Sequence, residues 1–209
     1  AGCGGGGSRA KPDLGFDTSV KAPTFVTVHP SLVIDEAHNN VHTRDGRFAP
    51  FAQLVASDGY EVRVNREPFA ASSLRGTAIL VVASPKGLPS DTDPAFTDAE
   101  CTAVQAWVAR GGALLLVTDH APIGTATEGL ARRFGIDMGK GEVQDPQHAA
   151  PEGRNPAQLV FTRDDGLIGH HPILEGRGPT ERVARVMTFT GQSLRGPTGS
   201  APLLLLSDT

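Results

Sequence analysis

The sequence of 209 residues lacks the features that mark two large classes of protein. It has no apolar run close to the roughly 20 residues that a membrane-spanning helix needs, so we expect no such helix. It also has no excess of positive charge, because its net charge is −4 and its isoelectric point is near 6.0. We therefore do not expect it to bind nucleic acid. Its 39% of hydrophobic and 20% of charged residues are typical of a globular domain.

Cysteine is scarce as well, since the sequence contains only Cys3 and Cys101. Ala1-Gly2 precede Cys3 and a run of glycines follows it, and this segment resembles the processing site of a bacterial lipoprotein. The resemblance implies a signal peptide, a lipid anchor on Cys3 and a location on the extracytoplasmic side of the bacterial cell envelope. Residues 1–24 are then a disordered tether, and Cys101 is a lone thiol. The alternative is a glycine-rich terminus with an incidental thiol.

Apolar segments with the lengths of strands alternate with amphipathic segments with the lengths of helices. Buried strands are expected at residues 31–34, 78–83 and 113–117, a short strand at 25–28, and a strand nearer the edge of the sheet at 60–64. Helices are expected at residues 48–57, 97–110 and 127–134. This alternation predicts an α/β fold with a mainly parallel, flavodoxin-like sheet and helices on both faces.

The start of the second helix carries its own signal. Thr97 and Glu100 have the spacing of a capping box, in which each side chain satisfies a backbone amide at the start of the helix. Basic and glycine residues from Arg110 to Gly112 predict the end of this helix.

The second half of the sequence is less regular. Residues 137–155 are polar and rich in Gly, Pro and His, which predicts a long loop. Residues 158–162, 184–189 and 203–206 are further strand candidates. We assign residues 25–209 to one domain, and we expect a C-terminal truncation because the sequence stops directly after a buried-looking strand.

Acidic residues and histidines follow two of the predicted strands. The first of these strands leads into Asp35-Glu36-Ala37-His38-Asn39-Asn40-Val41-His42, and the strand at 113–117 leads into Asp119-His120. Ligands of open parallel α/β sheets bind outside the carboxyl ends of the strands. The sequence therefore predicts a polar site at this edge.

Three interpretations of that edge remain open. A divalent transition metal such as zinc could be held by His38, His42, Asp119 and His120, because imidazole and carboxylate groups suit such ions. A metal-free site could pair Asp35 or Glu36 with His120 for acid–base chemistry. In the third interpretation, Asp35, His38 and Asp119 are structural residues that cap helices and hold loops.

Further residues near this edge of the sheet are candidates for contact with a ligand. We expect Asn39, Asn40 and His42 to contact a ligand, together with His171 from a later loop. No glycine-rich loop for phosphate follows the first strand, so a nucleotide-binding fingerprint is missing.

The segments Leu32 to Asn40 and Gly111 to His120, with His171-Pro172-Ile173 and Gly176, resemble the class I glutamine amidotransferase-like superfamily. The related branches are the trehalose-utilisation (ThuA-like) proteins and the gliding-motility ABC-transporter accessory domains. The resemblance implies a flavodoxin-like fold. Amidotransferases carry a nucleophilic cysteine on the turn that is occupied here by Asp119-His120, so glutaminase activity is not expected.

Two hypotheses for function follow. In the first, the protein is a hydrolase-like enzyme of the cell envelope that acts on a small polar molecule or carbohydrate, with Asp35, Glu36, His38, Asp119 and His120 as its catalytic residues. The carbohydrate rests on the family resemblance alone. In the second, the protein is a non-catalytic ligand-binding or accessory module with a transporter or envelope partner.

Overall fold

The computed structural model describes residues 11–151 and 155–207, and these fall into two compact units. Unit 1 contains the chain up to Gly87 together with Ala95–Val117. Unit 2 contains Leu88–Pro94 and the chain from Thr118 onward. No helix in the described part of the chain is long and apolar enough to cross a membrane. Each unit is described separately below.

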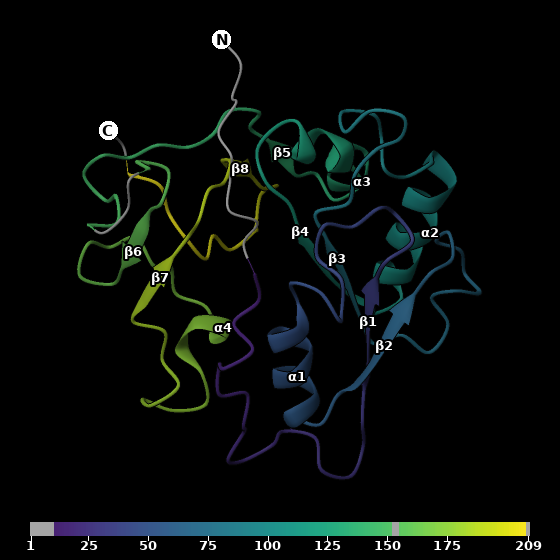
Figure 1. Cartoon of the computed structure of the whole chain (residues 1–209), viewed down its shortest axis with the longest axis horizontal. Coiled ribbons are helices and arrows are strands. Elements are labelled where there is room, and N and C mark those ends of the chain that lie inside the picture. Colours follow the sequence, from purple (N-terminus) through teal and green to yellow (C-terminus); the bar gives the residue numbers. More distant parts are fainter. Residues whose placement is uncertain (1–10, 152–154, 208–209) are drawn as a thin grey trace. The chain divides into compact units, whose positions relative to one another are not determined.

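The sheet of unit 1 has four strands, all parallel, in the order β2-β1-β3-β4 (Figure 1). These strands are β1 (Ser31–Asp35), β2 (Glu61–Asn65), β3 (Ile79–Ala83) and β4 (Ala113–Val117). In their register, Leu32 of β1 lies opposite Val62 on one side and Ile79 on the other. The α/β fold with flavodoxin-like topology that the sequence predicts is confirmed.

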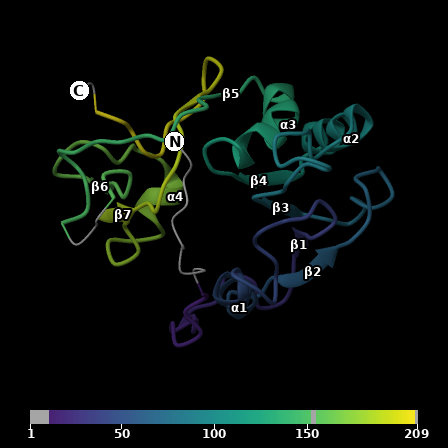
Figure 2. The ribbon, with the colours of Figure 1, turned by 45° about the horizontal axis from the view of Figure 1, so that its top comes forward.

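Two helices cover this sheet. α1 (Ala49–Ser57) connects β1 to β2, and α2 (Asp98–Ala109) connects β3 to β4. The two connections run outward in opposite directions across the sheet, so right-handed crossovers place their helices on opposite faces, as Figure 2 shows. On the α1 face, Leu32, Ile34 and Val81 form a core with Ala52.

The capping box at the start of α2 is confirmed. Thr97 accepts a hydrogen bond from the backbone of Glu100, and the Glu100 side chain accepts one from the backbone of Thr97. The other end of α2 is fixed by Trp107, whose indole nitrogen donates to the carbonyl of Thr77 at 3.2 Å. Trp107 is the only tryptophan of the sequence, so its fluorescence reports on unit 1 alone.

Two expectations about strands in unit 1 are wrong. Residues 25–28 form no strand, because Phe25 donates its backbone amide to Asp58 and His29 bonds the carbonyl of Gly59, which ties the segment to the end of α1. β4 is not fully buried, and its Leu115 is 42% exposed, because the strand order places β4 at an edge of the sheet.

Unit 2 is built from short elements. They are η1 (Ile123–Thr127), α3 (Glu128–Arg133), β5 (Asp137–Met138), β6 (Val160–Thr162), α4 (Pro172–Glu175), β7 (Arg185–Met187) and β8 (Leu194–Arg195). Its core contains Leu159, Phe161, Leu167, Ile168 and Leu174.

The late strand candidates are only partly correct. β6 and β7 lie within the predicted segments, but they pair with each other in antiparallel orientation and do not join the sheet of unit 1. Residues 203–206 form no strand, and only Leu204 makes an isolated bridge, to Ile168.

The predicted organisation into a tether and one domain stays a prediction. Residues 1–10, including Cys3, lie outside the described residues, and residues 11–24 contain no helix or strand.

Candidate functional site

His38 lies in a buried cluster of charged groups at the carboxyl end of β1. Asp35, the last residue of β1, is fully buried, and its Oδ2 lies 2.8 Å from Nδ1 of His38. Its Oδ1 accepts a hydrogen bond of 2.9 Å from the side-chain amide of Asn65, at the end of β2. The neighbouring strand therefore helps to hold the carboxylate in place.

The second ring nitrogen of His38 meets a second carboxylate. Nε2 lies 2.9 Å from Oε1 of Glu100, in the first turn of α2. Glu100 also accepts hydrogen bonds from the backbone amides of Phe69 and Thr97 and from the hydroxyl of Thr97. Because both ring nitrogens face carboxylate oxygens, the imidazole is held as a doubly protonated cation.

Two aromatic rings enclose this cation. The rings of Phe69 and Phe96 lie 4.6 and 4.7 Å from the ring of His38, measured between centroids. His38 is only 7% exposed. The two rings exclude water from the imidazole, which strengthens its interactions with the two carboxylates.

The pKa values of the cluster reflect these contacts. Burial lowers the pKa of His38, but the hydrogen bonds and negative charges of Asp35 and Glu100 outweigh it, so the pKa is raised. Burial raises the pKa of Glu100, but hydrogen bonds from His38, Thr97 and Phe69 together lower it to about 2. The pair is therefore ionised near neutral pH.

This geometry leaves His38 no ring nitrogen with which to bind a substrate. The cluster joins the loop after β1 to β2 and α2, which favours the structural interpretation of Asp35 and His38. The sequence pointed to both residues but missed the role of Glu100. The capping-box signal was present, yet it indicated only the start of a helix.

The other polar residues of the same loop also bond within unit 1. Glu36 accepts from the backbone of Arg44 and pairs with Arg66 at 3.2 Å. Asn40 accepts from the backbone of His38, and Asn39 occupies a left-handed conformation with φ of 50°. His42 stacks on Phe48, with ring centroids 4.9 Å apart. Their predicted contacts with a ligand stay predictions.

His120 and Asp119 have a more open environment in unit 2. Asp119 accepts hydrogen bonds of 2.8 and 2.9 Å from the hydroxyl of Thr190. Nδ1 of His120 lies 2.7 Å from the carbonyl oxygen of Ala121, so this nitrogen carries a proton and donates it. Nε2 lies 3.9 Å from Asp119 and 3.7 Å from Glu142, beyond hydrogen-bonding distance, and the side chain is 32% exposed. His120 is thus available for proton transfer.

The other two predictions from the sequence concern His171 and a metal. His171 caps α4, because its Nδ1 accepts a hydrogen bond of 3.2 Å from the backbone of Ile173. Over the described residues, no three or more His, Cys, Asp or Glu side chains are grouped so that they could hold a metal ion. The predicted use of His38, His42, Asp119 and His120 as metal ligands therefore gains no support.

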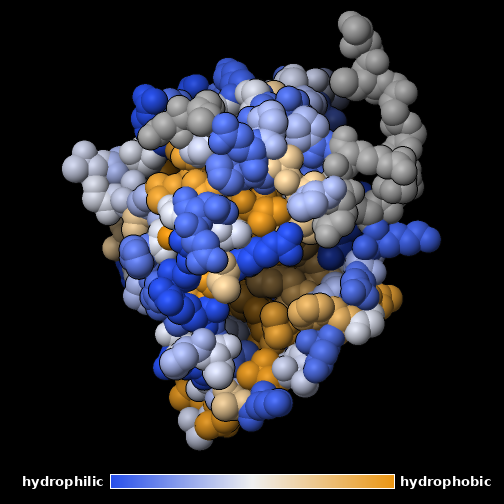
Figure 3. Space-filling view, turned by 90° about the vertical axis from the view of Figure 1, so that its left-hand side faces the viewer, coloured by the Kyte–Doolittle hydropathy of each residue, from blue (hydrophilic) through white to orange (hydrophobic). Residues whose placement is uncertain are grey.

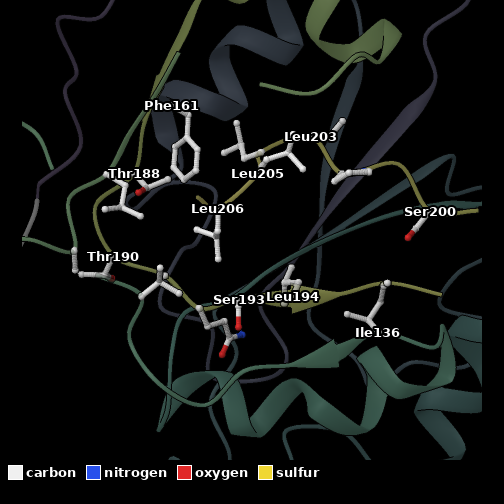
Figure 4. Close-up of a pocket in the computed structure, with 18 of the residues that line it drawn as sticks. Ile136, Phe161, Thr188, Thr190, Ser193, Leu194, Ser200, Leu203, Leu205 and Leu206 are labelled. Atoms are coloured by element: carbon white, nitrogen blue, oxygen red, sulfur yellow. The ribbon is translucent and has the colours of Figure 1, made fainter. Parts of the chain in front are cut away.

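Unit 2 also contains a cavity of about 600 Å³ that the sequence did not indicate (Figure 4). Apolar side chains dominate its lining, among them Phe161, Leu203, Leu205 and Leu206. The polar side chains that line it are uncharged: Thr188, Thr190, Gln192, Ser193 and Ser200. Its size and composition are those of sites that bind small molecules.

Hydrophobic side chains also reach the surface of unit 2. Leu194, Leu205 and Leu206 of the cavity lining are 61%, 38% and 44% exposed. Figure 3 shows hydrophobic side chains at several places on one face of the molecule, with hydrophilic side chains between them.

Comparison with known proteins supports the fold alone. No known protein family matches the sequence, and no curated protein matches it. A solved structure described as "mmIFT52 N-terminal domain" is similar, with a TM-score of 0.63 and 14% sequence identity over 83% of this chain and 71% of that one. This similarity shows a parallel α/β fold and does not assign an activity.

Proposed function

We propose that this chain is a non-catalytic domain that binds a small molecule in the cavity of unit 2. The cavity itself carries the proposal, because it combines apolar walls with a few hydrogen-bonding groups within a single unit. The lining favours an apolar molecule over a carbohydrate, since a carbohydrate needs more polar partners than five uncharged side chains provide. The closed environment of His38 supports a binding role over catalysis at the end of β1.

The neutral dye N-phenyl-1-naphthylamine, whose fluorescence rises in apolar surroundings, tests this proposal. Leu206→Asp is expected to weaken dye binding at least about tenfold, because it places a charge in the apolar lining. Leu206 is 44% exposed, so the substitution leaves the core of unit 2 in place.

Ile173→Asp is the matched control. Ile173 also belongs to unit 2, is 67% exposed and does not line the cavity. Its substitution should leave dye binding unchanged. Equal losses in both variants, or no binding by the wild type, would remove the support for the cavity as the binding site.

Acid–base catalysis at His120 is the second candidate function. It is favoured by one observation, the hydrogen bond from Nδ1 to Ala121, which leaves the lone pair of neutral His120 on the partly exposed Nε2. A hydrolase of this kind would lose turnover in His120→Ala while keeping its dye binding. Screening the wild type against neutral esters and amides therefore separates an enzyme from a binding module.

We further propose that the chain belongs to a branch of the class I glutamine amidotransferase-like superfamily without the catalytic cysteine. The strand order β2-β1-β3-β4 supports this relationship. Asp119-His120 follow β4, at the turn where amidotransferases carry the nucleophile.

The proposed location is the extracytoplasmic side of a bacterial cell envelope, with a lipid on Cys3 and a transporter or envelope complex as partner. The small residues before Cys3 and the glycines after it support this proposal. Cys3→Ser would then move the protein from the membrane fraction to the supernatant, and an unchanged distribution would contradict the anchor.

A further inference from the structure

Within residues 11–151 and 155–207, no ionisable side chain lines the cavity of unit 2. Its 19 lining residues include no Asp, Glu, Lys, Arg or His. An ionised group that entered the cavity would lose its hydration without gaining a counterion, which strongly opposes binding. Carboxylates, phosphates and ammonium groups are all unfavourable there for this reason.

Several charged residues adjoin the lining without belonging to it. Thr190 lines the cavity and donates its hydroxyl to Asp119. Val143 also lines it and follows Glu142, which faces His120 at 3.7 Å. Arg195 lies between the lining residues Leu194 and Gly196, so charges of both signs adjoin the lining and neither sign of ligand charge is favoured.

One buried polar atom lies on a lining residue and has no partner. Nε2 of Gln192 makes no hydrogen bond within the part of the chain that the structure describes. This nitrogen has almost no accessible surface, so a molecule in the cavity does not contact it, and the hydrogen-bonding groups that the lining offers are hydroxyls. The hydroxyls of Thr188, Ser193 and Ser200 offer hydrogen bonds.

We infer that the cavity binds an uncharged, mainly apolar molecule that carries a hydroxyl or carbonyl group. This inference rests on the proposed function and adds the chemical class of the ligand. It excludes fatty acids, nucleotides and amines, whose charged groups have no counterpart in the lining.

Three competitors with the same ten-carbon chain test the inference by displacing bound N-phenyl-1-naphthylamine. They are 1-decanol, decanoate and decylammonium, which differ in the charge of the head group. The inference predicts that decanol displaces the dye at a concentration at least about tenfold lower than either ion does. Thr188→Val, which removes a hydroxyl from the lining and keeps the size of the side chain, should weaken displacement by decanol about threefold more than it weakens dye binding.

The outcomes separate the two proposals. If the dye binds at the cavity but decanoate or decylammonium competes as well as decanol, the ligand class is wrong and the proposed function stands. If the dye does not bind, or binds equally to Leu206→Asp, both fail. If Thr188→Val weakens dye binding and displacement by decanol equally, the hydroxyl or carbonyl group is not part of the recognised class.

Discussion

Replacing His38 with alanine is expected to lower the free energy of unfolding of unit 1 by about 3–5 kcal/mol. The imidazolium separates two buried carboxylates, with Asp35 at 2.8 Å and Glu100 at 2.9 Å. Its removal leaves both of them without their cation and opens a space between Phe69 and Phe96. Urea unfolding followed by the fluorescence of Trp107 measures the loss, because this tryptophan lies in unit 1.

His29→Ala is the matched control for this variant. His29 also belongs to unit 1, but it is exposed and bonds only the carbonyl of Gly59. Its loss should cost no more than about 1 kcal/mol. If His38→Ala is no less stable than His29→Ala, the charged cluster does not stabilise unit 1.

A double variant separates charge from packing. Glu100→Gln combined with His38→Ala removes one uncompensated charge, and the amide keeps the size of the side chain. We expect the double variant to be more stable than His38→Ala alone. Equal or lower stability would mean that the lost packing, or the hydrogen bond that the amide nitrogen cannot accept from Phe69 or Thr97, outweighs the unpaired charge.

The stability of unit 1 is expected to be highest between about pH 4.5 and pH 6.5. Because folding raises the pKa of His38, this residue contributes stability that is fully present below pH 6.5, the ordinary pKa of histidine. That contribution is lost as the pH rises through the pKa of His38 in the folded state. Because folding lowers the pKa of Glu100, this residue contributes stability that is fully present above pH 4.5, the ordinary pKa of glutamate. That contribution is lost as the pH falls towards about 2. For Glu100, the fall from 4.5 to about 2 corresponds to about 3 kcal/mol.

Urea unfolding at pH 3, 5.5 and 9 measures this dependence through Trp107. The charged groups that contact the His38 ring are Asp35 and Glu100, and both favour its protonated form. In His38→Ala, the loss of stability at alkaline pH should therefore be smaller than in the wild type. An equal loss in the two proteins would assign it to other groups.

The fold of unit 1 could be predicted because its signals are local. The buried runs at β1 and β3 and the capping box at Thr97 each depend on residues that are close in the sequence. Unit 2 was harder, because the pairing of β6 with β7 joins segments more than 20 residues apart, and no local pattern encodes their antiparallel orientation.

The role of the candidate site could be predicted less well than its location. Asp35 and His38 are only three residues apart, but the partner that occupies Nε2 is Glu100, 62 residues away. That contact changes His38 from a candidate base into a buried cation. The sequence does not reveal the cavity, because the leucines of 203–206 have the pattern of a strand, whereas in the structure they line a space in unit 2.

The most direct test of ligand binding in unit 2 is an NMR titration that follows leucine methyl groups as N-phenyl-1-naphthylamine is added. The account predicts that the signals of Leu194, Leu205 and Leu206 in the cavity lining shift. The signals of Leu32 and Leu80 in the sheet of unit 1 should remain in place. Shifts confined to Leu32 and Leu80 would contradict the account and return the search for function to the carboxyl ends of the strands.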